Sequence, residues 1–147
     1  MDLETSLNLA RIALANSYFK TFKAQVYHWN VTGNMFLQIH EFFGEIYNSS
    51  FEAVDKFAEE IRSLGVMAPT SITELSRFSY ITLENNAVTC QEMLADLLDS
   101  NLKSLETLNK LFDSLSMIKE QGFADFVASE IDKIKKENWM IQSLMKE

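Results

Sequence analysis

Turn-forming residues are scarce in this sequence, and that scarcity limits the folds open to it. The 147 residues include four glycines and one proline, whereas a β-sandwich or barrel needs such residues at its many turns. Hydrophobic residues make up 47% of the chain, which is enough to bury a core and excludes a disordered chain. Both observations favour a few long helices joined by few turns, in one domain over residues 1–147.

Apolar spacing predicts four long helices and one short one. Apolar residues recur every three or four positions over 5–30. A turn around Gly33 follows, and a second helix is expected over about 35–64, capped by Asn34 and ended by Gly65. Residues 94–115 and 123–145 repeat the helical spacing, with Gly122 expected as the break between them.

Two capping boxes place the remaining helix starts. Ser71 and Glu74 predict a short helix near 72–78, while Thr89 and Glu92 open the third long helix. The short helix falls in the long connection between the second and third long helices. The predicted fold class is therefore all-α, a four-helix bundle with a short crossover helix.

Charge and composition exclude several partners. The net charge is −8, and the basic run 133–136 is interrupted and flanked by acids, so the surface is expected to repel DNA phosphates and anionic lipids. No apolar run reaches the roughly 18 residues of a membrane helix. The acidic opening lacks the basic region of a secretory signal, and one cysteine, Cys90, excludes a disulfide framework. We expect a cytoplasmic protein.

Two pairs of side chains are candidates for metal binding. His28 and His40 stand on either side of Gly33, so an antiparallel hairpin brings them together. Asp55 and Glu59, spaced i and i+4, share a helix face. Imidazole with carboxylate, and no thiolate, suits iron, manganese or zinc. The alternative is a solvated acidic face with ion pairs at the same spacing, Glu52–Lys56 and Glu59–Arg62.

Helix geometry separates the two pairs. His40 and Asp55 are fifteen residues apart on one predicted helix, which is roughly 22 Å at about 1.5 Å per residue. Either the pairs are unrelated, or the histidines of one subunit meet the acids of another across a two-fold axis. An intrachain di-iron centre of the Glu-x-x-His type is not supported, because Gln25 and Leu37 stand three residues before the histidines.

The motif around these residues resembles the Dps family, the mini-ferritins. The family pattern H-W-x-V-x-G…H-E…D-x-x-x-E is complete in His28 to Gly33, His40-Glu41 and Asp55 to Glu59. The resemblance extends along the chain in helix order, and its specific part lies in the first two predicted helices. It implies a ferritin-like bundle.

The resemblance also implies a function. Members form a dodecameric shell that oxidises Fe(II), preferably with hydrogen peroxide, stores Fe(III) mineral and protects against oxidative stress. The implied ferroxidase site takes His28 and His40 from one subunit and Asp55 and Glu59 from its two-fold partner, and zinc is a possible occupant. Trp29 is either an electron donor beside the site or a packing residue at the dimer contact.

One departure and several weaker assignments accompany the resemblance. Many relatives carry an acid four residues after the second histidine, where this chain has Gly44, so the second iron lacks that ligand unless water or Glu41 replaces it. Candidate residues of an acidic three-fold pore are Glu120, Asp125 and Glu130. Candidate residues for mineral nucleation are Glu41, Glu45 and Glu52.

Two other functions remain open from the sequence. One is a DNA-binding or scaffold shell with a vestigial metal site. The other is redox-silent sequestration of zinc or manganese. DNA binding is disfavoured because relatives that bind DNA usually use a basic tail, and the first base here is Arg11.

Overall fold

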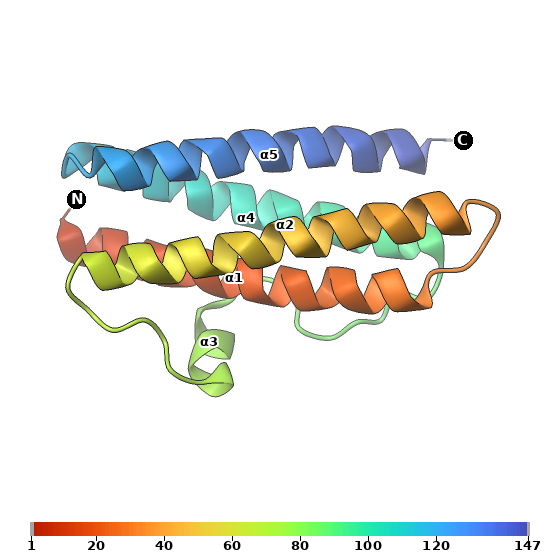
Figure 1. Ribbon diagram of the computed structural model, residues 1–147, viewed down its shortest axis with the longest axis horizontal. Coiled ribbons are helices and arrows are strands. Elements are labelled where there is room, and N and C mark those ends of the chain that lie inside the picture. Colours follow the sequence, from red (N-terminus) through yellow and green to blue (C-terminus); the bar gives the residue numbers. More distant parts are fainter. Residues whose placement is uncertain (1, 147) are drawn as a thin grey trace.

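A computed structural model describes residues 2–146 of the chain. Four long helices form an antiparallel bundle, and a short helix packs against α1 outside it (Figure 1). The predicted all-α bundle with its crossover helix is confirmed. The helices are α1 (Leu3–Asn30), α2 (Phe36–Ser63), α3 (Ile72–Phe78), α4 (Cys90–Met117) and α5 (Gln121–Met145). Within residues 2–146, no helix is long and apolar enough to cross a membrane.

The predicted caps of α3 and α4 are present. The Thr89 hydroxyl accepts the backbone N–H of Glu92 at 3.1 Å, and the Glu92 carboxylate accepts the N–H of Thr89 at 2.9 Å. Backbone donors favour the charged carboxylate, so the pKa of Glu92 is lowered. Ser71 accepts the N–H of Glu74 at 3.1 Å and starts α3 in the same manner. Local side-chain chemistry therefore fixes both starts.

Two predicted boundaries are wrong. Met35, not Asn34, is the N-cap residue of α2, and no side chain caps this end. Gly122 lies inside α5 instead of at the break. Lys119 makes that turn with a φ of 63°, and the N–H of Glu120 bonds to the Leu115 carbonyl at 2.9 Å. This Schellman-type ending closes α4 without glycine.

The bundle interior has two apolar clusters with a charged layer between them. Along α1 and α5, Lys20 and Glu137 separate the apolar cluster near the chain start from the cluster near the α1–α2 turn. Lys20 Nζ lies 2.6 Å from Glu137 Oε1, which also accepts the Asn101 amide at 2.8 Å. Both charged side chains are less than 10% exposed. The layer links α1, α4 and α5.

A second buried polar group lies nearby. The Lys23 ammonium contacts Asp96 Oδ2 at 2.7 Å, and the Tyr27 hydroxyl donates to the same oxygen at 2.5 Å. Burial, together with the Asp96 carboxylate, raises the pKa of Tyr27 above its ordinary value. These contacts join α1 to α4 next to the half of the bundle that carries the histidines.

Candidate metal site

The two histidines meet across the α1–α2 hairpin, as their distances from the turn predict. Gly33 makes this turn with a φ of 124°, a conformation that glycine adopts readily. His28 lies in the last turn of α1, and His40 lies near the start of α2. Their rings stack with centroids 3.8 Å apart and planes 13° apart.

Each imidazole donates a hydrogen bond to the backbone of the other histidine. His28 Nδ1 bonds to the His40 carbonyl at 2.6 Å, and His40 Nδ1 bonds to the His28 carbonyl at 2.7 Å. Because a carbonyl only accepts, each Nδ1 carries the proton, and each Nε2 keeps its lone pair. The His28 carbonyl is one that the end of α1 leaves without a helical partner. The pair therefore has the tautomer that a metal requires.

Aromatic rings flank the histidine pair on both sides. Phe36 stacks on His40 with centroids 5.1 Å apart, and Tyr47 lies against His28 at 5.4 Å. We did not predict these roles from the sequence. The available signal was spacing, since Phe36 precedes His40 by one helical turn. Trp29 is 59% exposed and takes no part in the described ring stack.

The two acids of α2 are exposed and unpaired. Within residues 2–146, neither Asp55 nor Glu59 has a hydrogen bond or ion pair. Neither of the two ion pairs considered, Glu52–Lys56 and Glu59–Arg62, is formed among the described residues, and the two exposed acids also agree with the alternative of a solvated acidic face. Lys56 lies over the Phe126 ring at 5.4 Å, and Arg62 donates to the Val66 carbonyl at 3.0 Å. Both carboxylates are therefore free to bind a cation.

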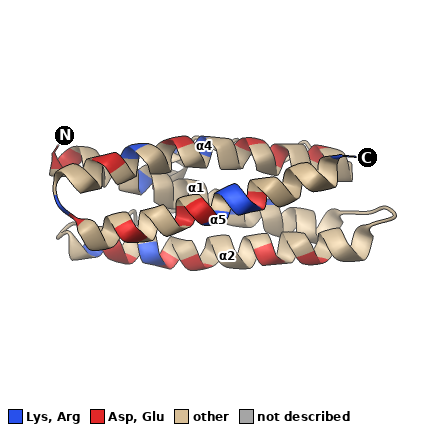
Figure 2. Cartoon of the chain, turned by 90° about the horizontal axis from the view of Figure 1, so that it is seen from above, with Lys and Arg blue, Asp and Glu red and all other residues tan. Residues whose placement is uncertain are grey.

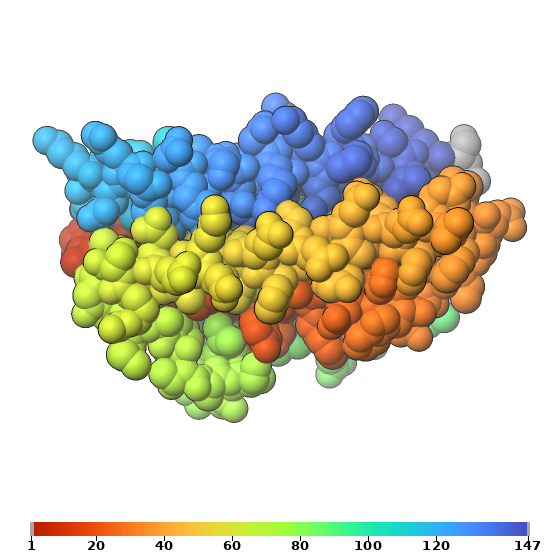
Figure 3. Space-filling model, in the orientation of Figure 1, coloured from red at the N-terminus to blue at the C-terminus, as the bar shows by residue number. Residues whose placement is uncertain are grey.

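A single chain does not assemble these groups into one site. His40 and Asp55 both lie on the uninterrupted helix α2, so their predicted separation of about 22 Å holds. Among residues 2–146, no three His, Cys, Asp or Glu side chains are grouped closely enough to hold a metal. The imidazole pair and the carboxylate pair are thus separate groups within one chain. In the space-filling view, α2 and α5 lie side by side on the face toward the viewer, and no other segment covers them (Figure 3).

The other acidic candidates have different surroundings. Acids recur along α2 (Figure 2), and Glu41, Glu45 and Glu52 are exposed. Asp125 is exposed near the start of α5, and Glu120 is the N-cap residue of that helix.

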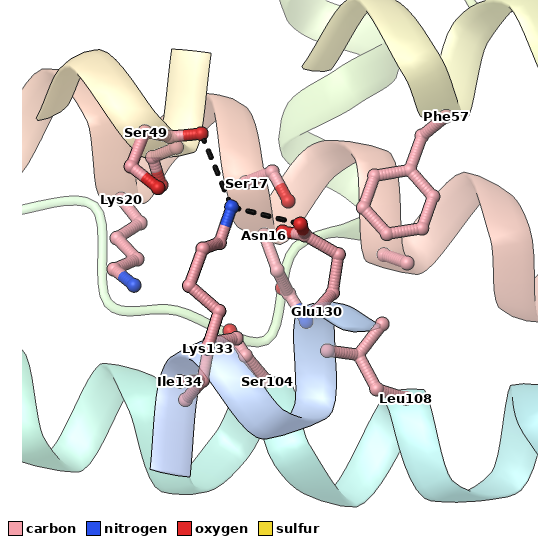
Figure 4. Close-up of a pocket in the computed structure, with 12 residues that line it drawn as sticks. Asn16, Ser17, Lys20, Ser49, Phe57, Ser104, Leu108, Glu130, Lys133 and Ile134 are labelled. Carbon is pink, nitrogen blue, oxygen red and sulfur yellow. Dashed lines mark hydrogen bonds and ion pairs between the residues drawn. The ribbon is translucent and has the colours of Figure 1, made fainter. Parts of the chain in front are cut away.

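Glu130 lies inside the bundle, which is at odds with a pore role. It is only 8% exposed and contacts Lys133 Nζ at 2.7 Å. Lys133 also donates to the Ser49 carbonyl of α2 at 3.4 Å, and these groups line a small cavity that polar and apolar side chains share (Figure 4). Asn16 lines the same cavity, and its amide nitrogen has no hydrogen-bond partner in the described chain.

Comparisons with known proteins agree with this fold and motif. A family model described as a ferritin-like domain matches residues 10–147. Antigen TpF1 of Treponema pallidum is 32% identical over 129 residues, covering 84% of this chain and 71% of the antigen. A low temperature-induced protein of Nostoc sp. is 29% identical over 143 residues, covering 95% of this chain and 79% of that protein.

A solved structure shows the same fold. The crystal structure of a Dps protein from Vibrio cholerae, described there as one of the ferritin-like diiron-carboxylate proteins, superposes with a TM-score of 0.92. It is 22% identical and covers 97% of this chain and 90% of the Vibrio chain. The chain belongs to the ferritin-like family. Within that family it is a member of the Dps mini-ferritins.

Proposed function

We propose that this protein is a ferroxidase whose active site is shared between two subunits. His28 and His40 of one chain bind Fe(II) through their free Nε2 atoms. Asp55 and Glu59 of a two-fold related chain supply the carboxylates. Glu59 is the strongest anchor, with Asp55 beside it. The observation that supports this proposal is the stacked histidine pair, with both Nδ1 atoms hydrogen-bonded, on the same chain as the exposed acids Asp55 and Glu59 but about 22 Å away from Asp55.

The ligand types suit iron oxidation. Neutral imidazoles bind ferrous iron, and carboxylates stabilise the more highly charged ferric product. Two Fe(II) ions deliver two electrons to one hydrogen peroxide, and with two protons this yields two water molecules and no hydroxyl radical. Oxygen is the alternative oxidant. Trp29, adjacent to His28 in the chain, is proposed as a nearby electron donor.

The wider assembly follows from the same proposal. Two-fold contacts complete the sites, and three-fold contacts close a dodecameric shell that stores the Fe(III) mineral. Glu120 and Asp125 are the proposed pore residues for Fe(II) entry. Glu41, Glu45 and Glu52 are proposed to nucleate mineral on the inner wall. Twelve chains of 16.9 kDa should sediment at roughly 200 kDa.

Mixed shells test the shared site. One variant lacks the histidines (His28→Ala with His40→Ala), and the other lacks the acids (Asp55→Ala with Glu59→Ala). Each variant alone should be inactive in peroxide-driven Fe(II) oxidation. In shells reassembled from equal amounts, half of the dimers are mixed, and each mixed dimer regains one of its two sites. We therefore expect about a quarter of wild-type activity.

Two controls test whether the regained activity comes from sites that two different subunits complete. A mixture of the two preformed variant shells, without reassembly, should stay inactive. A Glu60→Ala variant removes another acid of α2, next to Glu59, and should keep full activity. Inactive mixed shells of normal size would contradict a site shared between subunits. Mixed shells that regain zinc binding but no Fe(II) oxidation would favour redox-silent sequestration instead.

A further inference from the structure

Gly44 occupies an unusual place for a glycine. It is buried in the interior of α2, where glycine is among the least favourable residues. Gly33 and Gly65 have positive φ angles, and Gly44 does not share that backbone conformation. A Cβ atom at Gly33, Gly65 or Gly122 would meet nothing within 4 Å. Among the four glycines, Gly44 alone has close side-chain neighbours.

The neighbour of Gly44 is the imidazole of His28. A Cβ atom on Gly44 would lie 3.1 Å from His28 Cε1 and 3.2 Å from His28 Nδ1. Both distances are shorter than ordinary van der Waals contact, so the ring would have to move by a few tenths of an ångström. Nδ1 is also the atom that donates a hydrogen bond to the His40 carbonyl at 2.6 Å.

The imidazole has little freedom to move away. The His40 ring stacks on it at 3.8 Å, and the Tyr47 ring lies 5.4 Å away. Tyr47 Cε2 would itself be 3.9 Å from the added Cβ atom. A displacement that relieves the contact with residue 44 therefore disturbs the Nδ1 hydrogen bond or the ring stack, which together set the direction of the His28 Nε2 lone pair.

We propose that Gly44 is a positioning residue for His28, and that its missing side chain lets the imidazole lie directly against α2. This inference rests on the proposed function, because it takes His28 as a metal ligand. The resemblance to the Dps family leads us to expect an acid at this position. The first carbon of such a side chain needs the space that the His28 ring fills here. The site therefore favours one tightly held metal, because it has no room for the carboxylate that would bind a second one.

The test compares Gly44→Ala with Gly122→Ala in the intact shell, using Co(II) as a redox-stable probe. The control also adds one methyl group to a helical glycine, but in open space. We expect Gly44→Ala to weaken Co(II) binding about tenfold or more, as for other losses of ligand support, and to shift the Co(II) absorption bands. In its metal-free crystal structure, the His28 Nδ1 to His40 carbonyl hydrogen bond should be lost. Gly122→Ala should match the wild type in affinity and spectrum.

Gly44→Asp adds a carboxylate on the same Cβ atom. We expect it to bind a second Co(II) per site while holding the first more weakly than the wild type. If Gly44→Ala binds Co(II) with wild-type affinity and spectrum, or if Gly44→Asp binds the first ion as tightly as the wild type, the positioning role is overturned. His28→Ala separates the two proposals. If it binds Co(II) like the wild type, the proposed ferroxidase site itself fails.

Discussion

Replacing Lys20 with methionine should strongly destabilise the bundle without touching the metal ligands. Methionine has a similar length but no charge. In Lys20→Met, the Glu137 carboxylate loses its ammonium partner at 2.6 Å and keeps the Asn101 amide. Since Glu137 is only 6% exposed, bulk water has little access to replace the lost partner. The carboxylate must remain charged in a poorly hydrated place or take up a proton, and either outcome costs free energy.

The size of the effect follows from the burial of the pair. Breaking a buried ion pair by removing one partner costs about 3–5 kcal/mol. For a chain of this length, each kcal/mol lowers the melting temperature by about 3 °C. We therefore expect the Tm of the metal-free protein to fall by about 10–15 °C in differential scanning calorimetry. Lys110→Met is the matched control, because Lys110 pairs with Glu106 at 3.4 Å on the surface, where such pairs contribute below about 0.5 kcal/mol.

A double variant tests the mechanism. Lys20→Met combined with Glu137→Leu removes both charges, and we expect it to recover most of the lost stability because no unpaired charge remains. A Tm for Lys20→Met within about 3 °C of the Lys110→Met value would refute the reasoning. So would a double variant that is less stable than Lys20→Met alone.

Two further outcomes follow from charge and ligand chemistry. The assembled protein should not retard DNA in a gel-shift assay, because every copy adds a net charge of −8. The assay is run at about 50 mM salt without divalent cations, where electrostatic attraction is strong, so a clear shift would reveal a basic surface created by assembly. The affinity for Fe(II), measured anaerobically, should be lower at pH 5.5 than at pH 7.5. Imidazole binds metal only when neutral, and a free histidine side chain takes up a proton near pH 6.5. Equal affinities at the two pH values would contradict histidine ligation.

The sequence alone determined the helices, most of their ends and the pairing of the histidines. These features depend on neighbours within about four residues, as in the Thr89–Glu92 capping box, or on simple counting along helices. Similar distances from the turn at Gly33, five residues for His28 and seven for His40, brought the two rings together, and the helical rise separated His40 from Asp55. The Dps motif was readable for the same reason, because its residues lie on two consecutive helices.

Tertiary structure decided which groups touch between helices. Glu137 follows the apolar repeat of α5, between Ile134 and Ile141, but its partner Lys20 lies 117 residues away and no local rule selects it. The sequence predicts an exposed acid at Glu130, but the packing of the helices buries it. From the sequence, Gly44 is only the absence of a metal ligand, whereas the structure shows the His28 ring lying directly against it. Side-chain contacts between helices depend on how whole faces pack, and that packing is set by the complete bundle rather than by any one segment.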